Sequence, residues 1–214
     1  IKPEEAADFL KISAASFIWK FDKEIDNKLD MPVLGAFHNE KLIAGAEIYN
    51  HKCNYCGNLI NILHLDGICS QPEYRRMGGV RALFDEIGKN AAKNDITIGF
   101  LHPFSISYYE KFGFANLNPA FEIEVPFEKL SFIARNNDVE LYTGEQFEEL
   151  CELYNKCAKK ENLMVIRDDK KQFCEEPLEN ADYTYIHRNS SGEADGFARF
   201  TVKRPDNLIV EELY

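Results

Sequence analysis

The stretch PEYRRMGGVRALFDEI, residues 72–87, constrains the fold more than any other part of the chain. Two arginines and two glycines in it run directly into an amphipathic pattern. Apolar residues then recur at helical spacing and predict a helix over residues 79–94: Val80, Leu83, Phe84, Ile87 and Ala91. A mostly apolar run, LINILHLDGICS, ends at Ser70 just before this stretch and indicates a strand covered on both faces. The sequence therefore predicts a strand, a glycine-containing turn and a helix in immediate succession.

The flanking sequence predicts the remaining elements of a layered fold. Two short helices are expected at residues 1–10 and 13–21, with Phe9, Leu10, Phe17, Ile18 and Phe21 on one face. A hairpin is expected over residues 33–49, where Gly35 and Gly45 indicate bulges or close backbone approach. Later elements are a strand at 96–102, a helix at 103–112 ended by Gly113, and a strand at 121–125. This order predicts an α/β (α+β) fold, a mixed sheet with helices on its faces, complete by about residue 130.

The net charge of the chain limits the kinds of molecule that we expect it to bind. The 214 residues carry a formal net charge of −11, which argues against nucleic acid as a partner because phosphate binding needs a basic face. No apolar run approaches the roughly 20 residues that cross a bilayer, so no membrane partner is expected. The N-terminal residues lack the pattern of a signal peptide, although the chain does not begin with Met and a leader outside it stays open. A homo-oligomer also stays open.

Six cysteines bear on the redox environment, and only Cys53 and Cys56 form a C-x-x-C pair. A structural zinc site needs a second such pair or two histidines at fixed spacing, so this is half of a signature, with His51 and His64 nearby. The simpler interpretation is a polar loop with reduced thiols in a cytoplasmic protein, and no metal site is predicted.

The turn before the predicted helix has the composition of a phosphate site. The N-terminus of a helix offers free N–H groups and the positive end of its dipole, and glycines allow a ligand to approach the backbone. Arginines can bind phosphate oxygens in a forked geometry. Neither G-x-x-x-x-G-K-[ST] nor G-x-G-x-x-G is present. The alternative is a tight turn with solvated arginines.

The segment DGICSQPEYRRMGGVRALF resembles motif A of the GCN5-related N-acetyltransferases (GNAT), which bind acetyl-CoA. The usual pattern is R/Q-x-x-G-x-G/A between a strand and a helix, and Arg75, Gly78 and Val80 stand in its places. Val80 departs from the usual Gly or Ala, as in the enhanced intracellular survival (Eis) branch. The later LHPFSISYYEKFGF resembles the P-F-S-x-x-x-Y-x-x-F-G-[FY] pattern of that branch. The resemblance covers residues 1 to about 130.

The resemblance implies acetyl-CoA as cofactor and assigns residues to it. The backbone that pairs with the pantetheine arm matches three strand residues, Ile68, Cys69 and Ser70. The pyrophosphate loop matches Arg76, Met77, Gly78, Gly79, Val80 and Arg81. A second cofactor contact matches Phe104 and Ser105, and the general acid toward the leaving thiolate matches Tyr109. The general base of the family is a C-terminal carboxylate far beyond residue 214, so we expect it to be missing here.

The chemistry of acetyl transfer sets requirements of its own. The amine must be neutral, and a tyrosine of pKa near ~10 must be well placed to protonate a thiolate of pKa ~8.5. Spacing favours packing of Tyr108 with Phe104 and Phe112, which leaves Tyr109 turned elsewhere. Local base candidates are His64, Asp66 and Glu47 on the strands, and each of them can equally have a structural role.

Residues 131–214 show a similar order of elements. A helix is predicted over residues 144–163, with Phe147, Leu150, Leu153, Tyr154 and Cys157 along one face. Three strands follow within residues 182–214, as a helix, a hairpin and a third strand do in the first half. We interpret this part as the first half of a second, degenerate GNAT-like domain, within a fragment or a short relative of tandem-domain proteins. The alternative is an accessory sheet on the first domain.

The resemblance implies an N-acetyltransferase that acts on a primary amine of a small molecule or a side chain, as in aminoglycosides, polyamines or lysine. Acidic residues could line the acceptor site or simply be solvated: Glu122, Glu124, Asp22, Asp26 and Asp30. A function of another class is a non-catalytic acyl-CoA-binding or sensor module, which needs no general acid.

Overall fold

The computed structural model describes residues 1–117, 123–134, 137–167, 182–203 and 207–214. The chain divides into two compact units. The first unit consists of residues 1–52 and 60–119, and the second consists of residues 53–59 and 120–214. In the described part of the chain, no helix combines the length and the apolar character needed to span a bilayer.

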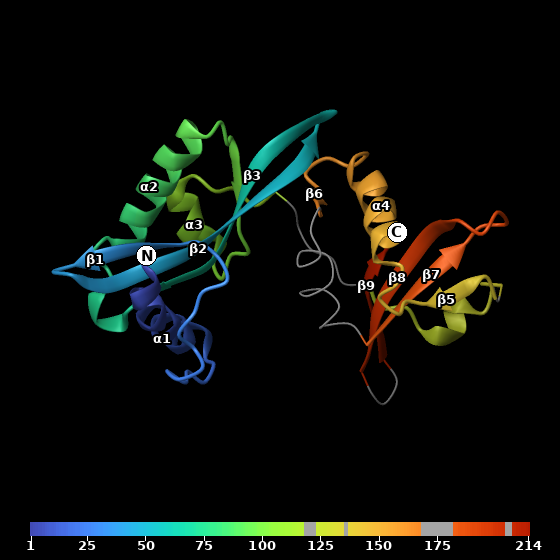
Figure 1. Cartoon of the computed structure of the whole chain (residues 1–214), viewed down its shortest axis with the longest axis horizontal. Coiled ribbons are helices and arrows are strands. Elements are labelled where there is room, and N and C mark those ends of the chain that lie inside the picture. Colours follow the sequence, from blue (N-terminus) through green and yellow to red (C-terminus); the bar gives the residue numbers. More distant parts are fainter. Residues whose placement is uncertain (118–122, 135–136, 168–181, 204–206) are drawn as a thin grey trace. The chain divides into compact units, whose positions relative to one another are not determined.

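The first unit is built on a mixed sheet (Figure 1). A 3-10 helix, η1 (Pro3–Glu5), leads into α1 (Ala6–Phe17), and the strands β1 (Val33–His38), β2 (Lys41–Tyr55) and β3 (Asn58–Ser70) follow. After these come η2 (Pro72–Tyr74), α2 (Gly79–Lys93), β4 (Ile98–Phe100), α3 (Ile106–Tyr109) and η3 (Glu110–Phe112). The strand order is β1-β2-β3-β4; β1 is antiparallel to β2 and β4 is parallel to β3. The predicted α/β fold, a mixed sheet with flanking helices, is confirmed.

The two longer helices of this unit cover opposite faces of the sheet (Figure 1). Leu83 and Ile87 of α2 pack on alanines and leucines of β2 and β3, whereas Phe9 of α1 packs in a separate cluster. Gly45 explains the close approach of α1, because a Cβ there would lie 2.5 Å from the Phe9 ring. Gly45 pairs with Gly35 on β1, so the expectation of close backbone approach at these glycines is confirmed.

Two local predictions were wrong. The two short helices expected before residue 21 are one helix, α1, which ends where Ile18 adopts a left-handed conformation with φ 61°. Phe17 and Ile18 are therefore exposed instead of sharing a buried face with Phe9. In the strand expected at 121–125, residues 123–125 have no strand conformation, and Phe121 and Glu122 lie outside the described residues.

The second unit contains a four-stranded sheet of order β5-β7-β8-β9. Its elements are η4 (Phe127–Leu130), β5 (Val139–Leu141), α4 (Phe147–Ala158), β6 (Val165–Ile166), β7 (Tyr183–Arg188), β8 (Ala194–Lys203) and β9 (Asn207–Leu213). Leu150, Leu153 and Tyr154 of α4 pack on Ile186 and Phe197 of the sheet, which confirms the predicted apolar helix face. The tip of the β2–β3 hairpin belongs to this unit, where Leu163 N–H donates to the Asn54 carbonyl over 2.8 Å.

Candidate acyl-CoA site

The turn between β3 and α2 is anchored to β2 at its beginning. The backbone N–H of Gln71 donates to the Ile43 carbonyl over 2.9 Å, and its side-chain amide donates to the Leu42 carbonyl over 2.7 Å. Beyond η2, Arg76 has φ 67° and Gly78 has φ 88°, so the chain reverses through two left-handed residues before the helix. Such turns expose consecutive N–H groups, which form concave anion-binding sites.

The first turn of α2 has no acidic side chain and no side-chain cap. Its N-cap is Gly78, beside which a Cβ would meet no atom within 4 Å. Glycine is required there by the backbone conformation, and the space above the helix end is open. Arg75, Arg76 and Arg81 around this end are exposed. The free N–H groups, the helix dipole and the arginine charges thus all favour an anion at the start of α2.

Gly79 and Val80 fix how α2 lies on the sheet. A Cβ on Gly79 would lie 3.2 Å from the Cβ of Ala44, so the second glycine permits close contact of helix and strand. The Val80 side chain packs against the cluster that contains Leu83. Val80, which departs from the usual Gly or Ala, therefore contributes to the hydrophobic core.

The edge of β3 beside this helix end is left free by β4. The pairing of β3 with β4 runs from Ile62 with Ile98 to His64 with Phe100, whereas β3 continues to Ser70. The side chains of Ile68 and Cys69 are used in the two core clusters, and burial raises the pKa of the Cys69 thiol to about 12. Backbone groups are therefore what these predicted cofactor residues offer to a ligand along this edge.

Tyr109 of α3 is buried in an aromatic cluster. Its ring lies 6.2 Å from that of Phe84, 5.5 Å from that of Phe104 and 6.1 Å from that of Phe114. Burial, with smaller contributions from Tyr108 and Asp66, raises the Tyr109 pKa to about 12. The hydroxyl group therefore keeps its proton at neutral pH and can act as a donor.

The neighbouring aromatic residues correct one prediction and confirm another. Tyr108 contacts both Phe104 and Phe112, as its spacing predicts. Tyr109 is not turned away from them, because it also packs on Phe104 and is more buried than Tyr108. Phe104 itself is 77% exposed, and Ser105 is the N-cap residue of α3. These two predicted cofactor residues thus lie at the start of the element that carries Tyr109.

The three candidate bases are carried by adjacent strands of the first unit. Glu47 of β2 accepts a hydrogen bond from the Tyr49 hydroxyl over 3.0 Å, and a Cβ on Gly67 would lie 2.7 Å from the Glu47 carboxyl carbon. Asp66 is exposed, and its carboxylate accepts the N–H of Gly67 over 2.8 Å. His64 is half-buried among aromatic rings, a grouping that the sequence analysis did not predict. Alternation along β2 could have predicted part of it, since Glu47, Tyr49 and His51 lie on one face of that strand.

The acidic residues predicted for the acceptor and the two cysteines of the C-x-x-C pair do not form a site in the described residues. Asp22 and Asp26 are joined in a local turn, where the Asp22 N–H donates to the Asp26 carboxylate over 2.6 Å. Asp22, Asp30 and Glu124 are exposed and Asp26 is partly exposed, which is typical of a solvated surface; Glu122 lies outside the described residues. Cys53 is fully buried and Cys56 is exposed, and within the described ranges no three metal-ligating side chains cluster.

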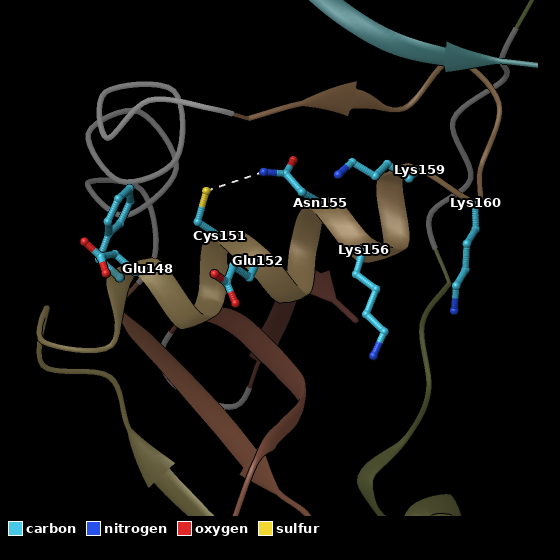
Figure 2. A pocket seen from close by; sticks show the side chains of 8 residues that line it. Glu148, Cys151, Glu152, Asn155, Lys156, Lys159 and Lys160 are labelled. Atoms are coloured by element: carbon cyan, nitrogen blue, oxygen red, sulfur yellow. Dashed lines mark hydrogen bonds between the residues drawn. The ribbon is translucent and has the colours of Figure 1, made fainter. Parts of the chain in front are cut away.

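A hollow of about 700 Å³ lies along α4 in the second unit (Figure 2). Its polar side chains already serve the local structure. The Asn155 side chain exchanges hydrogen bonds with the backbone of Arg167 over 2.5 and 3.0 Å, and the Cys151 thiol donates to the Arg167 carbonyl over 3.2 Å. The start of α4 lines one end of the hollow, and Glu148 in its first turn disfavours an anion there, so we assign the hollow no role in acyl transfer.

Comparison with known families agrees with the geometry of the first unit. A family profile described as the acetyltransferase (GNAT) domain matches residues 1–117, which is just over half of the chain. The chain belongs to the GNAT acetyltransferase family. No curated protein matches the sequence.

Solved structures show the same fold at low sequence identity. A conserved protein of unknown function from Enterococcus faecalis aligns with a TM-score of 0.79 at 18% identity, over 95% of this chain and 54% of that one. A GCN5-related N-acetyltransferase from Anabaena variabilis gives 0.78 at 18%, over 99% and 56%. Eis1 from Mycobacterium abscessus gives 0.70 at 17%, over 100% and 57%. This GNAT chain therefore spans a little over half the length of these three structures.

Proposed function

We propose that the protein is an acetyl-CoA-dependent N-acetyltransferase that moves an acetyl group by direct transfer to a primary amine. The observation that carries this proposal is the start of α2, where Gly78 and exposed arginines surround a helix end without acidic side chains. Family membership supports acetyl transfer as the reaction, and the helix end would offer a site for the pyrophosphate of the donor.

The residues of the first unit fit an acyl-CoA donor. Backbone groups of Ile68–Ser70, on the part of β3 that extends beyond its pairing with β4, would pair with the pantetheine arm. The loop of residues 76–81 would hold the pyrophosphate, and exposed Phe104 with Ser105 would give the second contact. When bound, acetyl-CoA supplies a thioester whose carbonyl carbon is open to attack by an amine.

Tyr109 is proposed as the general acid toward the departing thiolate. Its raised pKa of about 12 keeps the hydroxyl protonated over the whole range in which an amine acetylation is assayed. The aromatic rings around it hold the side chain in one orientation, which is what a proton donor needs.

The acceptor is proposed to be a small-molecule or side-chain amine rather than a nucleic acid, in keeping with the net charge of −11.

We further propose an Eis-like protein of the cytoplasm, in which residues 131–214 are the first half of a second, degenerate GNAT-like domain. The repeated order of helix, hairpin and third strand in the two units supports this interpretation.

A thiol-release assay with acetyl-CoA and a panel of aminoglycosides, polyamines and lysine peptides tests this function. Tyr109→Phe is expected to lower kcat by about 10²-fold or more, the usual contribution of an acid–base group, with unchanged acetyl-CoA affinity. Tyr108→Phe, which alters the neighbouring ring of the same helix, is the matched control and should keep its turnover. Equal turnover of both variants would contradict the role of Tyr109, and acetyl-CoA binding without turnover would favour a binding module.

A further inference from the structure

Tyr74, the last residue of η2, stands directly before the turn that leads into α2. Among residues 72–78, all of which the structure describes, it is the one residue that is not exposed. Arg75, Arg76 and Met77 therefore contribute no buried side chain that could fix the turn. The position of the turn depends on what holds Tyr74 before it and on the start of α2 after it.

The Tyr74 ring packs on the turn of the β1–β2 hairpin. The Lys41 ammonium group lies 4.8 Å from the centroid of the ring, and the centroid of the His38 ring lies 6.0 Å from it. A cation over the face of a tyrosine ring is attracted by the quadrupole of the ring. Because His38 and Lys41 are register partners in the hairpin, both contacts come from one short turn.

This hairpin turn has a defined backbone conformation. Asn39 and Glu40 have φ 47° and φ 64°, two consecutive left-handed residues as in a tight hairpin turn. From Lys41 the strand continues into the core, where Leu42 is buried. The Leu42 carbonyl accepts the side-chain amide of Gln71 over 2.7 Å. Two neighbouring residues of β2 thus contact the residue before η2 and the residue that ends it.

The backbone of Tyr74 connects these contacts to the anion site. Its carbonyl accepts the N–H of Met77 over 3.3 Å, across the left-handed Arg76. Met77 is followed directly by Gly78, the N-cap of α2. A displaced Tyr74 would therefore move the N–H groups and the arginine side chains to which we assign the pyrophosphate.

We propose that Tyr74, held by Lys41 and His38, is a positioning residue for acyl-CoA binding, an inference that rests on the proposed acetyltransferase function. Tyr74 acts through the turn of residues 75–78 and not by contact with the cofactor. It keeps this turn in its binding geometry before acyl-CoA arrives. A turn that is already ordered loses less conformational entropy on binding, so the affinity is higher.

The contacts predict which part of the side chain matters. Lys41 and His38 both contact the ring of Tyr74, and a phenylalanine ring attracts a cation in the same way. Tyr74→Phe should therefore keep the turn in place, whereas Tyr74→Ala should release it. Lys41→Met removes the cation but keeps an unbranched side chain.

Calorimetric titration of acetyl-CoA and of CoA into the full chain tests this role. Tyr74→Ala should weaken the binding of both by about five- to tenfold at unchanged stoichiometry, because both ligands share the pyrophosphate. Tyr74→Phe should bind them within about twofold of the wild-type affinity. Phe37→Ala removes an exposed ring from the residue before His38, so it is the matched control and should bind as the wild type does.

A double-mutant cycle tests the contact with Lys41. Lys41→Met should weaken binding by about two- to fivefold and should add no further loss in the Tyr74→Ala background, because Lys41 acts through the ring. Additive losses would overturn this arrangement.

Three further outcomes would overturn the role of Tyr74 and leave the proposed function standing. They are wild-type affinity of Tyr74→Ala, a loss for acetyl-CoA without one for CoA, and a lowered stoichiometry with unchanged affinity, which is what a merely structural role predicts. A wild-type chain that binds neither ligand would overturn this role and the proposed function together.

Discussion

The two units use their polar groups differently. In the first unit, the first turn of α2 has no acidic side chain, whereas the first turn of α4 in the second unit carries Glu148 and Glu149. In the first unit, β3 also extends beyond its pairing with β4. In the second unit, charged side chains bind one another: Glu212 joins Arg167 over 2.5 Å and Arg199 over 2.9 Å. The comparison indicates that backbone groups left available in the first unit can serve a ligand, whereas the polar groups of the second unit stabilise its own structure.

The largest loss of stability is expected when the shared carboxylate of the second unit is removed. Glu212→Ala takes away the carboxylate that Arg167 and Arg199 share, and Arg199 is only 1% exposed. Because one partner of a buried pair is lost, we expect the free energy of unfolding to fall by about 3–5 kcal/mol, measured by urea denaturation followed by circular dichroism. Glu211→Ala, at the exposed neighbouring position, is the control and should change it by less than about 0.5 kcal/mol. Equal stabilities of the two variants would show that these charges are not what stabilises the second unit.

A smaller loss of stability is expected from Gly45→Ala in the first unit. The new Cβ would lie 2.5 Å from the Phe9 ring, so α1 or its side chain must move. Overpacking of this kind costs about 1–3 kcal/mol, which a shift in the urea midpoint would report. A neutral result would mean that Phe9 has room to rearrange and that Gly45 is not needed for the approach of α1.

The smallest effect, with the opposite sign, is expected from Gly88→Ala. Gly88 lies within α2, where a Cβ would meet no atom within 4 Å. Alanine in an exposed helix position should therefore stabilise the protein by about 0.5–1 kcal/mol in the same urea experiment. Destabilisation would indicate that α2 needs flexibility at this position.

Much of the first unit could be predicted because the sequence signals for its helices and turns match the structure that these residues adopt. The start of α2 follows from glycines placed just before an amphipathic repeat, and Gly113 ends its helical segment with φ 90°, as predicted. The failure at α1 has a physical cause: a left-handed Ile18 ends the helix, a conformation that a β-branched residue rarely adopts and that no local signal announces.

The candidate site was predictable only where it depends on consecutive residues. The loop at residues 76–81 is contiguous in sequence, so its glycines and arginines could be recognised together. The ring stack around His64 joins three strands, and its neighbours Tyr49 and Phe100 become neighbours only through strand pairing. The burial of Tyr109 likewise depends on Phe84 of α2, which lies far from it in sequence.

The most direct test of the central claim is calorimetric titration of acetyl-CoA into the wild-type chain and two charge-reversal variants of the region around α2. Arg76→Glu changes the exposed arginine just before the N-terminus of the helix, and Lys93→Glu makes the same change of charge at its C-terminal end. We predict at least a tenfold loss of affinity for Arg76→Glu, which is about 1.4 kcal/mol, and wild-type affinity for Lys93→Glu. Equal affinities of the two variants, or no binding by the wild-type chain, would contradict the claim that the start of α2 binds the donor.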